Sequence, residues 1–114
     1  MKNTYQAGLF AEWIARQYLR LMGFQILEKR YVIGPGTGRA EIDIIARRND
    51  LILFIEVKKR SSRELGIGAV TWTQNRRLRA SAHQYLRRIR HIGPARFDII
   101  VVAPWRVYWI KNSI

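Results

Sequence analysis

The spacing of apolar residues changes several times along the chain, and each change marks a different element. Over residues 4–22 apolar side chains recur every three to four positions, which predicts a helix that ends at Gly23. A second helix is predicted over residues 73–91, before Gly93 and Pro94. The apolar positions of the first helix are Leu9, Phe10, Trp13, Ile14 and Leu21, and those of the second are Leu78, Ala82, Tyr85, Leu86 and Ile89.

Five other segments have the apolar pattern of strands. We expect these strands at residues 24–33, 40–47, 51–59, 97–103 and 106–111. Turns are predicted at the glycine-rich segment 34–38 and at Asn49-Asp50, and a polar loop at 61–68. The order α-β-β-β-α-β-β indicates one α/β domain over residues 1–114, with a mixed central sheet of about five strands flanked by helices.

The charge balance adds a first indication of the partner. The 114 residues include 21 Lys plus Arg against 8 Asp plus Glu, a formal net charge of +13, and 16 of the basic residues are Arg. Such a charge on one small domain is typical of nucleic-acid binders, although ribosomal or acidic-membrane partners give the same composition. The absence of Cys excludes disulfides and thiolate metal sites. Glu12, Arg16 and Arg20 interrupt the first apolar segment, so we expect no signal peptide, no membrane span and a cytoplasmic protein.

Three of the few acidic residues lie inside the most strand-like part of the chain. If the two strands that carry them pair as a hairpin, Asp43 lies opposite Glu56 and Glu41 lies opposite Lys58. Two facing carboxylates repel each other, and their burial is costly unless the charge is compensated. Two kinds of compensation are open at this point. One is a divalent cation, for which hard oxygen ligands favour Mg²⁺ or Mn²⁺, and the other is a salt network of Lys58 with nearby arginines.

Five motifs together resemble a known family. Asp43, followed thirteen residues later by Glu56-Val57-Lys58, resembles the D…(D/E)-x-K core of the PD-(D/E)XK nuclease superfamily. More narrowly, the chain resembles the YraN-like family, small bacterial proteins related to Holliday-junction resolvases. The collinear motifs are GLFAEWIA (8–15), AEIDIIA (40–46), FIEVKKR (54–60), RRLRASAHQYL (76–86) and RFDII (96–100). This resemblance implies a restriction-endonuclease-like core.

The resemblance also implies roles for individual residues. Asp43 and Glu56 match the metal-binding residues of the superfamily, and Glu12 matches a first-helix glutamate that adds a carboxylate. The metal would polarise a phosphate oxygen and lower the pKa of a bound water. Lys58 matches the lysine that orients this water or stabilises charge on the phosphorane. Glu41 matches a family glutamate and is either a ligand or a partner of Lys58, while the alternative for Glu12 is a solvated helical side chain.

Two positions depart from the family pattern. Ala40 replaces the glycine before E-I-D, which alters close approach of the backbone. Gln74 stands where the family commonly has Lys. It lies four residues before Leu78, so we expect it to point at the sheet, and some relatives in the superfamily hold the metal site with Gln at a comparable place. Gln74 is therefore included among the candidate catalytic residues.

Basic side chains form the predicted contact surface for DNA. Most of them lie on the polar face of the second helix, where they either follow a phosphate backbone or form only a solvated face. The candidate nucleic-acid-binding residues are Lys59, Arg60, Arg76, Arg77, Arg87, Arg88 and Arg90. Asp98, close to Arg96 at the start of a buried strand, is interpreted as structural.

Three classes of function are compatible with these residues. The favoured one is a metal-dependent endonuclease-like protein that hydrolyses DNA, with branched or flapped DNA added by the resemblance alone. The alternative is a non-catalytic nucleic-acid-binding module with the same fold, and a third class is a basic scaffold for an acidic protein surface. A pure binder has no need to place carboxylates beside phosphates, which favours the enzyme. A homodimer is left open.

Overall fold

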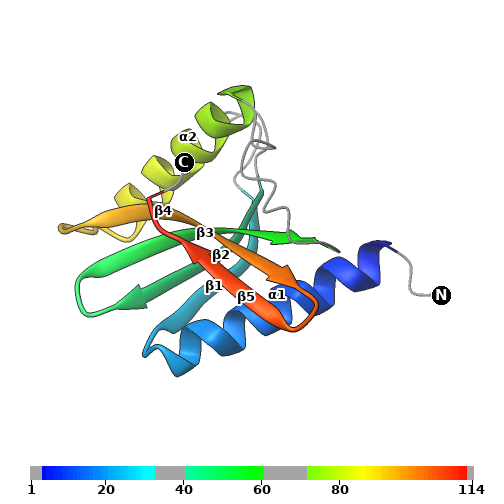
Figure 1. The fold of residues 1–114 in the computed structure, drawn as a ribbon. Helices are drawn as coiled ribbons and strands as arrows, with labels where there is room; N and C mark the ends of the chain where they lie inside the picture. The colour runs from blue at the N-terminus through cyan, green and yellow to red at the C-terminus, as the bar shows by residue number, and fades with distance from the viewer. Residues whose placement is uncertain (1–3, 33–40, 61–71, 113–114) are drawn as a thin grey trace.

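The structure is a computed structural model that describes residues 4–32, 41–60 and 72–112, with only the backbone at 4 and 72–75. The predicted turn at 34–38 and loop at 61–68 lie outside the described residues. The elements follow the predicted order (Figure 1). They are α1 (Thr4–Leu21), β1 (Gln25–Val32), β2 (Glu41–Arg48), β3 (Leu51–Lys59), α2 (Trp72–Arg88), β4 (Ala95–Ala103) and β5 (Arg106–Ile110).

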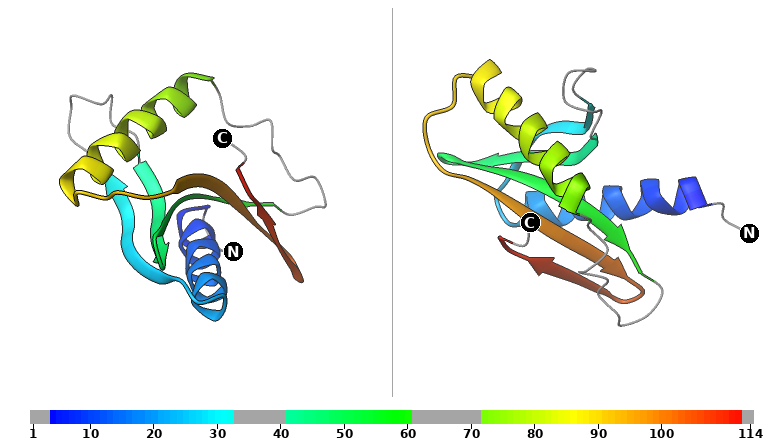
Figure 2. Two further views of the ribbon diagram at one scale, coloured as in Figure 1. Left: turned by 90° about the vertical axis from the view of Figure 1, so that its left-hand side faces the viewer. Right: turned by 90° about the horizontal axis from the view of Figure 1, so that it is seen from above.

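The five strands form one mixed sheet in chain order, β1-β2-β3-β4-β5. Neighbouring strands are antiparallel except β3 and β4, which are parallel. A parallel pair needs a crossover connection, and α2 lies within that connection. The two helices cover opposite faces of the sheet, which gives three layers (Figures 1 and 2). The predicted α/β core with a mixed five-stranded sheet is therefore confirmed.

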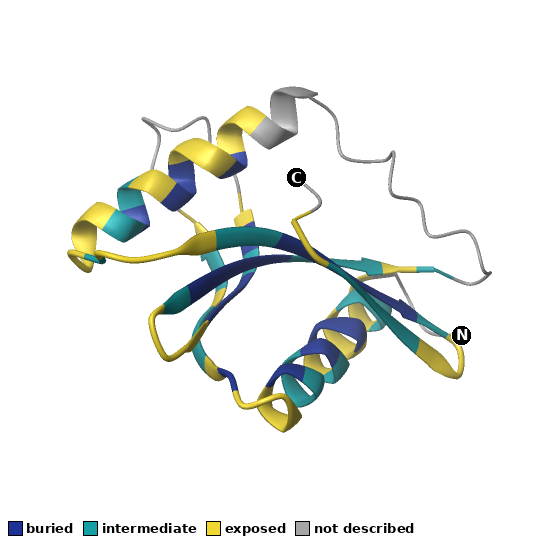
Figure 3. Cartoon of the chain, turned by 60° about the vertical axis from the view of Figure 1, so that its left-hand side comes forward, coloured by how far each residue is buried: buried dark blue, intermediate teal, exposed yellow. Residues whose placement is uncertain are grey.

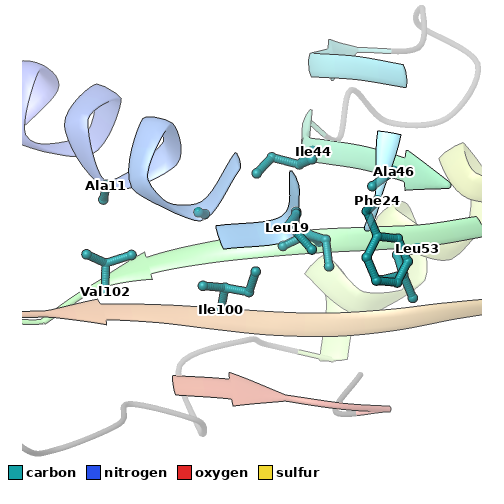
Figure 4. Close-up of a cluster of buried hydrophobic side chains, with 10 residues drawn as sticks. Ala11, Leu19, Phe24, Ile44, Ala46, Leu53, Ile100 and Val102 are labelled. Atoms are coloured by element: carbon teal, nitrogen blue, oxygen red, sulfur yellow. The ribbon is translucent and has the colours of Figure 1, made fainter. Parts of the chain in front are cut away.

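Helix α1 packs on the sheet through its small residues. Ala11, Ala15 and Leu19 are buried in one cluster with side chains of β2, β3 and β4 (Figure 4). Short side chains allow the helix backbone to approach the sheet, and this approach buries Glu12, which is only 7% exposed. Most of the large side chains whose spacing predicted the helix are instead exposed, namely Leu9, Phe10, Trp13 and Leu21.

Helix α2 covers the other face with most of its predicted apolar stripe, whereas Ile89 lies beyond the helix end and is exposed. Leu78, Ala82 and Tyr85 are buried in a second cluster with residues of β2 and β3. The helix ends at Arg88 instead of residue 91, because the backbone turns left-handed at Arg90, with a φ of 55°. Its outer face is exposed (Figure 3). In the part of the chain that the structure describes, no helix is long and apolar enough to cross a membrane.

Asp98 is fully buried on β4 and receives hydrogen bonds from three residues. The Arg96 guanidinium donates to both carboxylate oxygens, with Nε–Oδ1 and Nη2–Oδ2 distances of 2.9 Å each. Trp109 Nε1 on β5 donates to Oδ2 at 2.8 Å, and the backbone N–H of Asn112 donates to Oδ1 at 2.8 Å. These contacts tie the end of β5 to the start of β4, which agrees with a structural role for Asp98.

We expect Asp98→Ala to destabilise the fold by about 3 kcal/mol, because it leaves Arg96 without its counter-charge and two further donors without an acceptor. Urea unfolding measures this loss of free energy. The control is Asp50→Ala, which removes an exposed carboxylate from the turn between β2 and β3 and should change stability by less than about 0.5 kcal/mol. Equal stability of the two variants would contradict the structural role.

Candidate metal centre at a fork in the sheet

Strands β2 and β3 separate before either of them ends. Their antiparallel ladder stops at the pair Ile44–Ile55. Beyond this pair β2 continues beside β1 as far as Glu41, whereas β3 continues beside β4 as far as Lys59. The sheet therefore opens into a fork, with β1 and β2 forming one branch and β3, β4 and β5 the other (Figure 1).

The fork limits how far the predicted strand pairing holds. Along the paired part the register is the predicted one. If this register continued past the last pair, Asp43 would lie opposite Glu56 and Glu41 opposite Lys58. The ladder between β2 and β3 contains neither of these pairs. The acidic residues thus lie where the backbone pairing of these two strands has ended.

The side chain of Asp43 connects the two branches of the fork. Its Oδ2 accepts a hydrogen bond of 2.8 Å from the backbone N–H of Val57 on β3. The alternation of side chains also changes at Asp43, because Ile42 packs in the cluster under α2 and Ile44 in the cluster under α1. Residues two apart on a regular strand share a face. The local break in β2 thus coincides with the residue that spans the fork.

Strand β1 is irregular at the matching position. The β1–β2 ladder skips Arg30 and Asp43, which the register on either side would set opposite each other. Arg30 has a φ of 50°, a left-handed conformation that is uncommon outside glycine. Its guanidinium forms two hydrogen bonds with the Glu12 carboxylate, Nε–Oε1 at 2.8 Å and Nη2–Oε2 at 3.2 Å. Strained backbone persists where surrounding contacts hold it, and this ion pair is such a contact.

Three carboxylates meet beside the fork. One oxygen each from Glu12 of α1 and from Glu41 and Asp43 of β2 lie within 4.8 Å of one another. Glu12 is buried, Asp43 is partly buried and Glu41 is exposed, so the cluster is open on one side. Oxygen donors without Cys or His are the ligand set that Mg²⁺, Ca²⁺ and Mn²⁺ prefer. This acidic cluster could hold a metal ion.

Basic side chains compensate part of the negative charge. Besides the Arg30–Glu12 pair, Lys58 Nζ lies 3.4 Å from Glu56 Oε1, and both side chains are largely buried. The salt network considered from the sequence is therefore present for two of the carboxylates. The ion pairs among the described residues do not include Asp43.

The remaining negative charge acts on Asp43. Burial raises the pKa of Asp43 to about 8, and repulsion by Glu56, Glu12 and Glu41 adds to this rise, while the hydrogen bond from Val57 opposes it. Burial also raises the pKa of Glu56, against the attraction of Lys58. A cation beside these oxygens would favour their ionised forms. The donor set and its excess charge therefore fit a divalent metal.

The predicted site residues are only partly brought together. Glu12 and Asp43 meet in the cluster, and Glu56 acts on Asp43 from the other branch without belonging to the three carboxylates within 4.8 Å. Lys58 lies on that branch beside Glu56. The side chain of Gln74 and all of Ala40 lie outside the described residues.

The predicted nucleic-acid-binding residues lie on two elements. Lys59 is exposed at the end of β3, and Arg60 follows it with its Nη1 donating to the Lys59 carbonyl at 2.8 Å. Arg88 Nη1 donates to the Tyr31 hydroxyl at 3.0 Å, which places Arg88 over the β1–β2 branch. The other members are exposed on or just beyond α2, namely Arg76, Arg77, Arg87 and Arg90.

No motif of the sequence indicates Arg30 as a site residue. The segment that contains it has the pattern of an ordinary strand, and nothing in that pattern indicates a left-handed residue. Its pairing with Glu12 depends on the approach of α1 to the sheet. The charge of Arg30 was therefore visible in the sequence, but its position was not.

The arrangement defines an α/β domain with an acidic candidate metal centre at a fork in its sheet. The sequence model of the "Uncharacterised protein family UPF0102" matches residues 11–102, which include Glu12, Glu41, Asp43, Glu56 and Lys58. The chain belongs to this family, the YraN family that its motifs indicate.

Curated relatives match nearly the whole chain. The UPF0102 protein amb4503 of Paramagnetospirillum magneticum is 40% identical over 102 residues, which cover 88% of this chain and 79% of the relative. The UPF0102 protein R00337 of Rhizobium meliloti is 45% identical over 106 residues, covering 91% and 84%. The UPF0102 protein Atu0303 of Agrobacterium fabrum is 44% identical over 108 residues, covering 93% and 85%.

The raised pKa of Asp43 predicts how stability depends on pH and metal. In the folded state Asp43 keeps its proton up to about pH 8. Its contribution to the free energy of unfolding is therefore full below the pKa of the unfolded state and is lost as the pH rises through about 8. Asp43→Asn removes the ionisable group but keeps an oxygen that can accept the Val57 N–H. The variant should therefore have a higher melting temperature than the wild type in metal-free buffer above pH 8, where Asp43 would be ionised. Mn²⁺ should stabilise the wild type and leave the variant nearly unchanged.

Thermal melts in EDTA and in Mn²⁺, at about pH 5 and about pH 9, measure both effects. Asp50→Asn is the control, because Asp50 is exposed and distant from the fork in the turn between β2 and β3. A wild-type melting temperature that millimolar Mn²⁺ does not move would count against the metal centre.

Proposed function

We propose that this protein is a Mg²⁺- or Mn²⁺-dependent endonuclease-like enzyme that hydrolyses phosphodiester bonds in DNA, branched or flapped DNA among them. The observation that carries this proposal is the cluster of Glu12, Glu41 and Asp43 in a chain with a net charge of +13. Carboxylates repel phosphates, so a basic protein gains nothing in binding from concentrating them at one point. A metal between the two removes that conflict, and DNA as substrate suits a cytoplasmic protein.

The proposed ligands are Asp43, Glu12 and Glu56, and Glu41 provides a further carboxylate within the cluster. The bound ion would supply Lewis acidity, which polarises a phosphate oxygen and lowers the pKa of a water. Asp43 is held in place by the amide of Val57, and Glu12 is held by Arg30. Both carboxylates are therefore oriented before any ligand binds.

Lys58 is the candidate for stabilising the transition state. Its ammonium lies 3.4 Å from Glu56, and its side chain is only 17% exposed. In such a partly desolvated place its positive charge acts strongly on the charge that develops on the phosphorane oxygens. Gln74 stays a proposed catalytic residue from its position in the first turn of α2.

A non-catalytic nucleic-acid-binding module is the second candidate function. The observation that favours it is that Arg30 and Lys58 already neutralise Glu12 and Glu56 without a metal. In that case the acidic residues would only hold the two branches of the fork and α1 together. The two functions differ in whether Lys58 affects turnover.

Lys58→Ala should lower cleavage by roughly 100-fold or more, because the lost charge acts mainly on the transition state. DNA affinity should change little, since Lys58 is one basic residue among many. The measurement is cleavage and binding on labelled linear, flapped and four-way DNA with Mg²⁺, Mn²⁺ or EDTA. Lys29→Ala removes an exposed charge from β1 and is the control.

Cleavage by Lys58→Ala at the wild-type rate would refute the catalytic role of Lys58 and indicate a contaminating nuclease. Tight binding by the wild type without cleavage of any substrate would favour the non-catalytic module.

Simultaneous replacement of Arg87, Arg88 and Arg90 by Gln should weaken DNA binding at low salt. If each arginine contacts a phosphate, the slope of log affinity against log salt should fall by about 0.9 for each lost contact. Titrations at several salt concentrations measure this slope. Arg106→Gln, an exposed arginine on β5, is the single-charge comparison. A triple variant with the wild-type slope would place the phosphate contacts elsewhere.

A further inference from the structure

Helix α1 exposes three aromatic side chains, two of which stack on each other. Tyr5 is 63% exposed, Phe10 49% and Trp13 51%, and the rings of Phe10 and Trp13 stack with their centroids 6.1 Å apart. Large exposed aromatic groups that gather on one element are typical of binding surfaces.

Two arginines follow the aromatic residues along the helix, Arg16 partly buried and Arg20 exposed. Arg16 follows Trp13 by three residues and Arg20 follows Arg16 by four, which places them on the same side of the helix. Arg16 lies close to further charges, since its pKa is lowered by burial and by Arg20 and Arg30, while Glu12 opposes this. The aromatic rings are thus bordered by several positive charges, as a polyanion requires.

Tyr5 connects helix α1 with the candidate metal centre. The guanidinium of Arg30 lies over the ring of Tyr5, 5.3 Å from its centroid, and the same guanidinium holds Glu12. Glu12 in turn belongs to the carboxylate cluster with Asp43. A strand that contacts Tyr5 would therefore lie close to the cluster.

We infer that Tyr5, Phe10 and Trp13 form a stacking surface for unpaired nucleotide bases. Arg16 and Arg20 bind phosphates of the same strand. Aromatic rings stack on every base, so this surface binds single strands without sequence preference. Duplex DNA keeps its bases stacked and offers only its phosphates. This inference rests on the proposed function, to which it adds a substrate class: DNA with an unpaired strand beside the scissile bond.

Charge favours a nucleic acid over a second copy of this chain as the occupant. Two copies that met through α1 would bring together two chains of net charge +13, with Arg16 and Arg20 near the contact on each side. Such like charges repel at physiological ionic strength, where the Debye length is about 8 Å. A single strand supplies both the bases for the rings and the negative charge for the arginines.

The test measures equilibrium binding of an oligothymidylate and of a duplex of the same length, both in EDTA so that no cleavage occurs. Trp13→Ala should weaken oligothymidylate binding by roughly 10-fold or more and duplex binding by less than about 2-fold. Trp13→Phe should retain most of the affinity, whereas Trp13→Leu should behave like Trp13→Ala, because leucine is apolar but cannot stack. Ile92→Ala removes an even more exposed apolar side chain, between α2 and β4, and should alter neither affinity.

Tyr5→Ala provides a second variant, and thermal melts confirm that each variant is folded. Equal loss for duplex and oligothymidylate, or wild-type affinity in Trp13→Leu, would overturn the stacking surface. If the wild type sediments as a dimer and Trp13→Ala as a monomer, with oligothymidylate binding unchanged, the stacking surface would be overturned in favour of self-association. Because binding is measured without metal, the expected pattern in a protein that cleaves no DNA would uphold the surface and reject only the enzyme.

Discussion

The separation of β2 from β3 after Ile44–Ile55 is the constraint on which the site depends. Strands that part within a sheet leave backbone groups without their ladder partners, and buried groups of this kind are costly. The Asp43 carboxylate takes over part of the missing pairing by accepting the N–H of Val57. The same side chain that stabilises the opening of the sheet therefore also supplies the carboxylate at its centre. The structure of the fork and the proposed chemistry thus both depend on the Asp43 side chain as a hydrogen-bond acceptor. Asp43→Asn keeps an acceptor at this place, and Asp43→Ala would remove it.

The partners of the buried acids separate structural from functional carboxylates. Asp98 is enclosed by Arg96, Trp109 and Asn112, which together satisfy its charge and its lone pairs. Asp43 has one amide donor and three neighbouring acids, and its pKa rises to about 8. A buried carboxylate that the protein leaves uncompensated is a candidate for an external cation. In a chain with so few acids, this difference identifies Asp43 rather than Asp98 as the focus of the site.

Regular patterns in the sequence predicted the regular part of the structure. The element order, the five-stranded sheet and the register of β2 against β3 all follow from apolar spacing and from one turn. Spacing extrapolates a strand as if it stayed regular, so it could not predict the fork or the change of alternation at Asp43. The left-handed backbone of Arg30 has no sequence signal either, since that conformation is uncommon for arginine. Glu41 joined the cluster through the geometry of the fork, although its motif had already marked it as a candidate ligand.

Helix α1 has two faces with different consequences for the site. The apolar periodicity of its sequence predicts the helix, but the largest apolar side chains of the helix are not the ones that are buried. Ala11 and Ala15 allow the helix to lie close to the sheet, and only this closeness brings Glu12 to Asp43. A larger residue at either position would hold the helix away and withdraw a carboxylate from the cluster. Because the small residues take the buried side, the large side chains of Phe10 and Trp13 are left exposed. The packing that brings Glu12 into the acidic centre therefore also leaves aromatic side chains of the same helix exposed.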